Sequence, residues 1–423
     1  MWCNRTIAAI GLALATGAGG SAGAMPLDEA LRAARYGDVG PISAAVAHIR
    51  DPAVVALAQL EIAAAELDPP AVRHALNAYL ASHDRNPVRR ARVWALATST
   101  SFTLGDYATA ADAGARWCGA LKQADPWHEA ADAAQVQALA ALLAKAPPMR
   151  VASAGGVAAG TTRDAAGLIR ANAMIDGVTQ PSVLDTGADL STISASAAAR
   201  LHLHMIDGAA SVSSTTRQAV PIRIGIADEV SLAGFTFRNV AFLVLDDSEL
   251  RIPLANGYAI DAIIGAPLFR AMGSVTFTGD SLVPALPTDP ARSSALRMSG
   301  GAMFVALRVG SIPLALHLDT GASASALSPE FAREHAGIVA GLRQTDQHVA
   351  GAGGISAIKA AHWRNVPVTL GGIPTTLPDL GIVLQGPAGA TDWTLGTIGQ
   401  DLLGRFRSYT IDFREMRFAV TPR

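Results

Sequence analysis

Apolar residues recur every three or four positions from about residue 26 to residue 146. Ala133, Val136 and Ala140 show this spacing, which places one apolar stripe along a helix. Alanine and leucine dominate the region and β-branched residues are sparse, as is usual in helices. The pattern therefore predicts an all-α domain over residues 25–147.

Two passages of this helical part resemble each other, "ARYGDVGPISAAV" and "FTLGDYATAADAG", and both contain Gly-Asp. Gly37 and Gly105 are 68 residues apart, which is twice the 34-residue period of tetratricopeptide helix pairs. A weaker copy, "ELDPPAVRHALNAYL", lies midway between them. The helical part therefore resembles a tetratricopeptide repeat array, and an irregular helical bundle is the alternative.

The pattern changes after the helices. Residues from about 147 to 165 are rich in Gly, Ala, Pro and Thr, as expected of a linker. Beyond them, short runs such as Val240 to Leu245 are separated by glycine turns, which favours strands. A second linker is expected over about 284–301. The sequence thus predicts two all-β units, at 165–285 and 298–423.

Composition restricts the function classes. Half of the residues are hydrophobic and 16% are charged, so the chain can bury a large core. The formal net charge is −2. A protein that neutralises phosphates needs a basic excess, so nucleic acid is not an expected partner.

The N-terminus has the features of an export signal. Arg5 is followed by the apolar stretch Ile7 to Ala15 and by a small-x-small cleavage site that ends at Ala24. Residues 1–24 are therefore predicted to be a signal peptide, and a buried N-terminal helix is the alternative. The mature protein is expected in the periplasm or outside the cell, without a membrane anchor.

Cysteine and histidine provide little chemistry. Cys3 lies in the predicted signal peptide, so Cys118 remains as a single cysteine and no internal disulfide is expected. His202 and His204 alternate as on one face of a strand, but no further metal-ligating residues accompany them at suitable spacing. No metal and no cofactor are expected.

The two β-rich units contain copies of one motif. Residues 183–188 read VLDTGA, and residues 317–322 read HLDTGA. A later apolar-Gly pair follows in each unit, as IIGAPL at 263–268 and as TIGQDL at 397–402. Asp185 and Gly265 are 80 residues apart, and so are the corresponding Asp and Gly of the second copy. Two ordered pairs with the same spacing indicate an internal duplication.

Paired carboxylates have a defined chemistry. Two carboxylates held close together cannot both ionise at low cost, so they share one proton. The ionised carboxylate can take a proton from water while the protonated one polarises a substrate carbonyl. Asp185 and Asp319 are therefore the candidate catalytic residues.

These motifs resemble those of the aspartic peptidases of the pepsin and retropepsin group, over about residues 165–423. The resemblance implies two retropepsin-like lobes in one chain, with a single cleft formed in cis, a monomer and a polypeptide substrate. It also implies that the Gly-containing segment crosses beneath the active-site loop. The residues that the resemblance assigns to the crossing segments are Ile264, Gly265, Ile398 and Gly399.

The residues next to each Asp have implied roles as well. Gly187 and Gly321 allow a tight turn that brings amides near the carboxylates. Thr186 and Thr320 are expected to hydrogen-bond across the pseudo-twofold axis, and plain turn formation is their alternative role.

Alanine follows the glycine in both copies. Ala188 and Ala322 stand where pepsin-like enzymes usually have serine, whose hydroxyl would lower the carboxylate pKa. Activity is therefore expected in mildly acidic to near-neutral buffer. His317, two residues before Asp319, is a second group that could tune the pair, and a packed or solvated histidine is the alternative.

Glycine-rich hairpins suit the flap that covers the cleft of such enzymes. The candidate flap residues in the second copy are Gly351, Gly353 and Gly354. The corresponding stretch of the first copy, Ser213 to Gln218, contains no glycine. An ordinary surface hairpin is the alternative.

The sequence leaves several functions open. The leading hypothesis is an aspartic endopeptidase whose helical domain recruits substrate or a protein partner, regulates access, or aids folding. A peptide-binding scaffold with a relic protease fold is the second hypothesis, although both Asp residues are present. A third is an assembly in which each copy pairs with that of another molecule.

Overall fold

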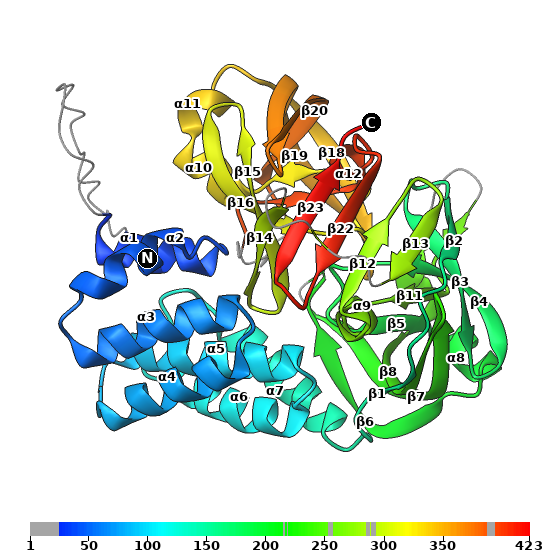
Figure 1. Cartoon of the computed structure of the whole chain (residues 1–423), viewed down its shortest axis with the longest axis horizontal. Coiled ribbons are helices and arrows are strands. Elements are labelled where there is room, and N and C mark those ends of the chain that lie inside the picture. Colours follow the sequence, from blue (N-terminus) through cyan, green and yellow to red (C-terminus); the bar gives the residue numbers. More distant parts are fainter. Residues whose placement is uncertain are drawn as a thin grey trace, which may run out of the picture.

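The computed structural model describes residues 25–214, 216–217, 219–252, 257–284, 288, 293–386 and 394–423. The expected signal peptide, residues 1–24, lies outside the described residues. Within them, an all-α domain precedes two β lobes, which confirms the predicted fold class (Figure 1).

Helix starts in the α domain follow a common rule. Asp51, Asp68 and Asn86 each accept a hydrogen bond from a backbone N–H of the helix they precede, and proline follows each of them. The helices are α1 (Leu27–Arg35), α2 (Gly40–Ala45), the 3₁₀ helix η1 (Val46–His48), α3 (Pro52–Ala65), α4 (Pro69–Ala81), α5 (Pro87–Thr103), α6 (Tyr107–Leu121) and α7 (Ala130–Leu143).

The two glycines of the similar passages occupy similar places. Gly37 follows α1 and Gly105 follows α5, with φ of +81° and +78°, a conformation that glycine adopts without strain. Another helix begins within three residues of each. Consecutive helices pack side by side, α3 with α4, α5 with α6, and α6 with α7.

Lobe 1 is an antiparallel β structure with two short parallel pairings. Its elements are β1 (Arg150–Ser153), β2 (Ala159–Arg163), β3 (Ile169–Ile175), β4 (Val178–Leu184), β5 (Ser191–Ser194), α8 (Ala195–Arg200), β6 (His204–Val212), β7 (Val220–Leu232), β8 (Phe235–Leu245), η2 (Asp247–Leu250), β9 (Arg251–Ile252), β10 (Tyr258–Ala259), β11 (Ala262–Ile264), α9 (Ala266–Met272), β12 (Ser274–Phe277) and β13 (Ser281–Pro284).

Lobe 2 repeats this order with longer strands in its hairpins. Its elements are β14 (Ser293–Ser299), β15 (Ala302–Val309), β16 (Ile312–Leu318), β17 (Ala326–Leu327), α10 (Pro329–Glu334), α11 (Ala336–Val339), β18 (Arg343–Gly351), β19 (Gly354–Leu370), β20 (Ile373–Gln385), β21 (Gly396–Ile398), α12 (Gln400–Leu403), β22 (Ser408–Asp412) and β23 (Arg417–Thr421).

A third sheet joins the lobes. Its strands lie in the order β2, β13, β12, β22, β23 and β14, with every neighbouring pair antiparallel. The central pair, β12 and β22, contains the closing strands of the two copies. Tyr409 stacks on Phe277 beneath it with ring centroids 5.0 Å apart. The duplicated units thus share one sheet and one core.

Both expected linkers contain strands, so the linker prediction was wrong in part. Within the first, β1 pairs with β8 and β2 pairs with β3 and β13. Within the second, β14 pairs with β15 and β23, while residues 285–287 and 289–292 lie outside the described residues. Glycine, proline and alanine predict a loop, but neighbouring edge strands offered hydrogen-bond partners that outweighed local propensity.

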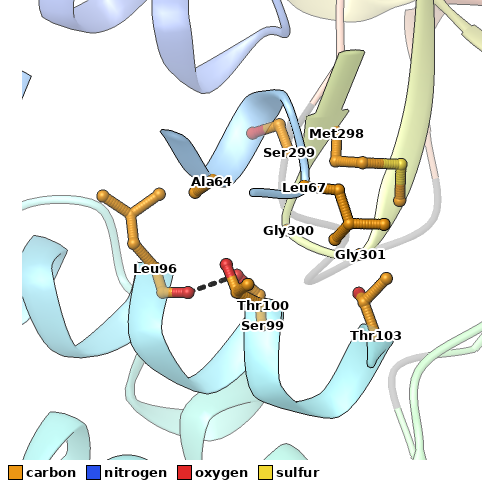
Figure 2. Close-up of a pocket in the computed structure, with 10 residues that line it drawn as sticks. All are labelled: Ala64, Leu67, Leu96, Ser99, Thr100, Thr103, Met298, Ser299, Gly300 and Gly301. Atoms are coloured by element: carbon orange, nitrogen blue, oxygen red, sulfur yellow. Dashed lines mark hydrogen bonds between the residues drawn. The ribbon is translucent and has the colours of Figure 1, made fainter. Parts of the chain in front are cut away.

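The helical domain packs against lobe 2 at the β14–β15 turn. Figure 2 shows Gly300 and Gly301 of this turn beside Thr100 and Thr103 of α5, around a hollow of only about 10 Å³. The Ser299 hydroxyl donates a hydrogen bond to the Arg35 carbonyl, 2.9 Å away. This interface is closely packed.

Ion pairs and an aromatic contact extend the same interface. Arg32 of α1 pairs with Glu330 and Glu334 of α10, the latter at 2.9 Å. The Phe304 ring fills the space beside Gly37, so a Cβ at Gly37 would lie only 2.3 Å from it.

Helix α7 packs against lobe 1 along β6. The Leu142 side chain fills the space beside Gly208, since a Cβ there would lie 2.5 Å from a Leu142 methyl carbon. The Ser213 hydroxyl donates to the carboxylate of Asp132 at 3.3 Å and to the side-chain oxygen of Gln135 at 3.0 Å. One end of the β6–β7 hairpin, the first hairpin, is therefore held by the helical domain.

Candidate active site

Asp185 stands where β4 ends. The parallel strand β11 lies beside β4, with Ile263 opposite Val183 and Ile264 opposite Leu184. The Asp185 N–H donates to the Ile264 carbonyl at 3.0 Å. The segment that precedes Gly265 therefore runs beneath the loop of the first Asp.

The second copy has the same arrangement. Strand β21 runs parallel to β16, with Ile398 opposite Leu318. The Asp319 N–H donates to the Ile398 carbonyl at 3.1 Å. In each copy, the strand that contains the apolar-Gly segment thus holds the backbone of the Asp residue in place.

Glycine is required where these segments cross the loops. A Cβ on Gly265 would lie 2.6 Å from the carbonyl carbon of Leu190, and one on Gly399 would lie 2.6 Å from that of Ala324. The Gly265 N–H donates to the Ser191 hydroxyl at 3.1 Å. Any side chain here would push the crossing segment away from the active-site loop.

The two Thr residues form the contact between the loops. The Thr186 N–H donates to the Thr320 hydroxyl oxygen at 2.9 Å, and the Thr320 N–H donates to the Thr186 hydroxyl oxygen at 3.3 Å. The Thr320 hydroxyl in turn donates to the Leu184 carbonyl at 2.8 Å. Both side chains are buried. The structure therefore brings the two copies together within one chain.

The carboxylates of Asp185 and Asp319 meet at this contact. A Cβ on Gly187 would lie 2.6 Å from the Asp319 carboxyl carbon, and one on Gly321 would lie 2.3 Å from that of Asp185. Each carboxylate also accepts an N–H of its own loop: Asp185 from Gly187 at 2.8 Å, and Asp319 from Gly321 at 2.7 Å.

Ala188 has a part in the same network. Its N–H donates to the Asp185 carboxylate at 3.0 Å, while its carbonyl accepts from the Ala266 N–H at 2.9 Å. The Ala322 carbonyl accepts from the Gln400 N–H at 2.9 Å in the second copy. The methyl side chains of the two alanines offer no hydroxyl to the carboxylates.

The two buried carboxyls influence each other's ionisation. Burial, the neighbouring Asp319 charge and a hydrogen bond to Asp319 raise the pKa of Asp185 well above its usual range. Burial also raises the pKa of Asp319, but its loop amides and the hydrogen bond from Asp185 oppose that shift. The pair therefore shares a proton that it keeps above the range where ordinary carboxyls lose theirs.

His317 lies in the core below the pair. Its side chain is buried and its ring is 6.1 Å from that of Phe304, centroid to centroid. Burial lowers the pKa of His317 to about 4, against the attraction of the Asp185 charge. The imidazole is therefore neutral near pH 7, in agreement with a packed histidine.

Three further ionisable residues, Asp189, Arg270 and Tyr107, interact electrostatically near the first loop, and the motifs did not indicate them. Burial, together with the Asp185 charge, raises the pKa of Asp189 to about 6, although part of the residue is exposed, and Arg270 opposes this shift. The Arg270 guanidinium donates to the Thr103 carbonyl at 2.8 Å. Tyr107 faces the same two charges, and burial raises its pKa. The helical domain thus reaches the loop that carries Asp185.

One difference between the sequences of the two copies could have pointed to Asp189. Asp189 follows the first Asp-Thr-Gly-Ala, whereas Ser323 stands at the same place in the second copy. An acid that breaks an internal repeat next to a catalytic motif is a candidate for a separate role. Arg270 and Tyr107, which interact with Asp189 electrostatically, lie in other elements, so the sequence alone did not connect them.

The candidate flap glycines lie at the turn of the hairpin β18–β19. Gly351 ends β18, Gly354 begins β19, and Gly353 has φ of +97°. A Cβ on Gly353 would lie 2.8 Å from a Val220 methyl carbon of the first copy. The turn therefore contacts the other lobe.

The corresponding stretch of the first copy connects β6 to β7, and its residues 215 and 218 lie outside the described residues. The Thr216 hydroxyl donates to the Ala352 carbonyl at 3.0 Å, and the Ser356 hydroxyl donates to the Thr216 carbonyl at 2.6 Å. The Gly353 N–H donates to the Glu249 carbonyl at 3.0 Å. The tips of the two hairpins are thus joined.

One apolar cluster connects the hairpin tips with the active-site loop. It contains Ala188 and Leu190 of the loop, Val220 of β7 and Ala352 of the second turn. Leu139 and Leu143 of α7 belong to the same cluster, as do Phe102 and Tyr107 around the α5–α6 corner. The helical domain, the first hairpin and the Asp185 loop therefore pack as one unit.

No helix among the described residues combines the length and apolar character needed to cross a membrane. No group of three or more His, Cys, Asp or Glu side chains in this part of the chain is arranged to hold a metal ion.

Part of lobe 1 is similar to a known protein family. Residues 171–268 match the family model described as aspartyl protease, and this stretch contains both Asp185 and Gly265. The resemblance recognised from the motifs is thereby confirmed. No curated protein matches the chain. Among the matching solved structures is a retropepsin-like aspartic protease from Rickettsia conorii, with 17% identity, coverage of 32% of this chain and 91% of that chain, and a TM-score of 0.22.

Proposed function

We propose that this chain is an aspartic endopeptidase that hydrolyses polypeptides with water activated between Asp185 and Asp319. The observation that carries the proposal is the close approach of the two carboxyls at the hydrogen-bonded contact of two duplicated loops. The match of residues 171–268 to the aspartyl protease family supports a peptide hydrolase. Because both loops belong to one chain, the proposed site is complete in a monomer.

The proposed reaction needs one proton on the pair. A water molecule between the carboxyls gives a proton to Asp319 while its oxygen attacks the peptide carbonyl carbon. Asp185 gives its proton to the carbonyl oxygen, and a neutral tetrahedral diol forms. Asp319 then returns its proton to the leaving nitrogen as the C–N bond breaks. Asp185 takes back a proton from a diol hydroxyl, which restores the starting state.

The location of the activity is part of the proposal. The apolar N-terminal stretch and its cleavage site support export to the periplasm or beyond the cell. Detection of the mature N-terminus near Met25 in a secreted or periplasmic fraction would test this, and retention of residues 1–24 on a cytoplasmic protein would contradict it.

Cleavage of an unfolded protein between pH 3 and pH 8 tests the chemistry. Wild-type protein is compared with Asp319→Asn and with Asp112→Asn, a control at an exposed position of α6. Mass spectrometry of the products should show new peptides with the wild type and the control, and none with Asp319→Asn. Equal cleavage by Asp319→Asn would refute the mechanism, and a folded wild type without activity would favour the peptide-binding scaffold.

A further inference from the structure

A hollow of about 410 Å³ opens on the helical domain. It lies between α4, the first half of α5, and α6. The helices α3 and α7, by contrast, contact strands of the lobes. The residues that line the hollow are Tyr79, Leu80, His83, Asp84, Arg90, Trp94, Arg116, Gly119 and Ala120.

The hollow has an excess of positive charge. Its one carboxylate, Asp84, is held by Arg89 through two hydrogen bonds of 2.6 and 2.9 Å, and it accepts a third from the Tyr79 hydroxyl at 2.9 Å. The Arg89 guanidinium keeps the pKa of Asp84 well below its usual range. Neither Arg90 nor Arg116 forms an ion pair with a carboxylate in the residues that the structure describes.

An aromatic surface holds one of these guanidinium groups in place. The Arg116 guanidinium carbon lies 5.0 Å from the Trp94 ring centroid, in a cation–π contact. Leu80 adds an apolar wall, with 45% of its side chain exposed. The hollow thus combines apolar surface with two arginines that have no acidic partner among the described residues, which suits a ligand with one anionic and one apolar group.

We propose that this hollow binds the C-terminal residue of a polypeptide, with its carboxylate on Arg90 and Arg116 and its apolar side chain on Trp94 and Leu80. Guanidinium groups form charge-assisted hydrogen bonds to carboxylates, often in pairs. A chain terminus supplies a carboxylate and an apolar side chain on one residue, whereas an internal Asp or Glu supplies only the carboxylate.

The proposed ligand connects the hollow with the proposed function, on which this part of the inference rests. Every peptide bond that the enzyme hydrolyses creates a new C-terminal carboxylate. The hollow would therefore retain N-terminal cleavage products or recruit substrates that have already been cut once. Binding itself requires no catalysis, so it can be measured independently of the active site.

Fluorescence anisotropy of a labelled decapeptide that ends in leucine tests the proposal. The peptide is used as the free acid and as the C-terminal amide, with full-length mature protein that carries Asp319→Asn to prevent cleavage. We expect the free acid to bind at least tenfold more tightly than the amide, and increasing salt to weaken its binding. Equal affinity for the acid and the amide would overturn the proposal.

Variants assign the binding to the hollow. Arg90→Gln and Arg116→Gln should each weaken binding of the free acid at least tenfold, while Arg73→Gln, at an exposed position of α4, should leave it unchanged. Gly119→Phe provides a variant that keeps every charge, because a Cβ at Gly119 meets no atom within 4 Å. It should block the hollow without disturbing the fold.

The two proposals fail in different ways. If the free acid binds but no substrate is cleaved by the wild type, the hollow stands and the peptidase proposal falls. If substrates are cleaved but Gly119→Phe and the two arginine variants bind the free acid as the parent does, the hollow is not the binding site and this inference is wrong.

Discussion

The Thr186 N–H donates to the hydroxyl of Thr320 at 2.9 Å, across the contact of the two loops. The residues are 134 positions apart, the same separation as between Thr276 and Thr410, whose hydroxyls lie 2.8 Å apart in the central strands of the shared sheet. One pseudo-twofold axis therefore passes through both pairs. The duplication is preserved as a symmetric contact, and it places the two carboxylates face to face.

The two threonines are not equivalent, which leads to a first prediction. Thr320 both accepts from Thr186 and donates to the Leu184 carbonyl, and its side chain is fully buried. Thr320→Val should lower the free energy of unfolding by about 1–3 kcal/mol, because it leaves buried polar groups without partners. The change and its effect on kcat can be measured by urea unfolding and by peptide cleavage.

Two control variants sharpen that prediction. Thr320→Ser keeps the hydroxyl and should recover most of the stability and the activity. Thr186→Val, whose hydroxyl accepts a longer bond of 3.3 Å, should cost less than Thr320→Val. An equal loss for both valine variants would contradict the proposed asymmetry.

The glycine of the second loop provides another prediction. A Cβ at Gly321 would lie 2.3 Å from the Asp185 carboxyl carbon, so Gly321→Ala must displace the carboxylate. We expect a loss of kcat of at least a hundredfold, since small displacements of catalytic groups have large effects on rate. Gly337→Ala is the matched control, because a Cβ there meets no atom within 4 Å. Near-normal activity of Gly321→Ala would show that the loops adapt.

Sequence reasoning located the site because the site is local and repeated. Asp185 and Asp319 end strands whose apolar pattern is readable, and the equal spacing to Gly265 and Gly399 defined the crossing segments. The same motif also located the Thr, Gly and Ala residues that follow each Asp. Their assigned roles in catalysis stay predictions until activity is measured.

Features that depend on contacts between distant segments were not predictable. The strands β1 and β2 arise in a stretch with loop composition, because β8, β3 and β13 offer hydrogen-bond partners. The hydrogen bond from Arg270 to the Thr103 carbonyl and the electrostatic interaction of Arg270 with Asp189 join three elements that no motif connects. The packing of α7 on β6 likewise follows from tertiary structure alone.

The packing of α7 on β6 predicts control of the first hairpin by the helical domain. Leu142→Ala would empty the space beside Gly208 and loosen β6, at a cost of about 1–2 kcal/mol for a partly buried leucine. Hydrogen exchange at the backbone amide of Thr216 should become faster, and KM should rise. Leu104→Ala, at a side chain that is 45% exposed, is the control and should change neither. Unaltered exchange at Thr216 in Leu142→Ala would show that α7 does not control the mobility of the hairpin.

The same packing predicts that the helical domain is not a removable segment. Leu139 and Leu143 of α7 share an apolar cluster with Val183 and Leu190 next to the first Asp. A chain that begins after residue 147 would expose this cluster to water, so we expect it to aggregate or to unfold at a lower temperature than the longer protein. Size-exclusion chromatography and thermal unfolding test this, and a monomeric, active fragment would support a folding aid that is later removed.

The raised pKa of Asp185 predicts the pH dependence of both activity and stability. Cleavage requires one proton on the pair, so it should fall at low pH when both carboxyls are protonated and at high pH when both are ionised. Because burial and the Asp319 charge raise the pKa of Asp185, the upper limb should extend toward neutral pH. A single rate maximum below about pH 3 would contradict this, because ordinary carboxyls have pKa values near 4.

The raised pKa of Asp185 also predicts how stability depends on pH. The direction is opposite to that expected for a carboxyl whose pKa is lowered by a nearby cation. A carboxyl whose pKa is higher in the folded state binds its proton more tightly there, so it contributes stability below its unfolded pKa of about 3.9. That contribution is lost as the pH rises through the folded pKa. Asp185→Asn removes the ionisation and should therefore raise the melting temperature at pH 7 relative to the wild type. At pH 3 the two proteins should melt together, and a lower melting temperature for Asp185→Asn at pH 7 would show that the carboxylate stabilises the fold instead.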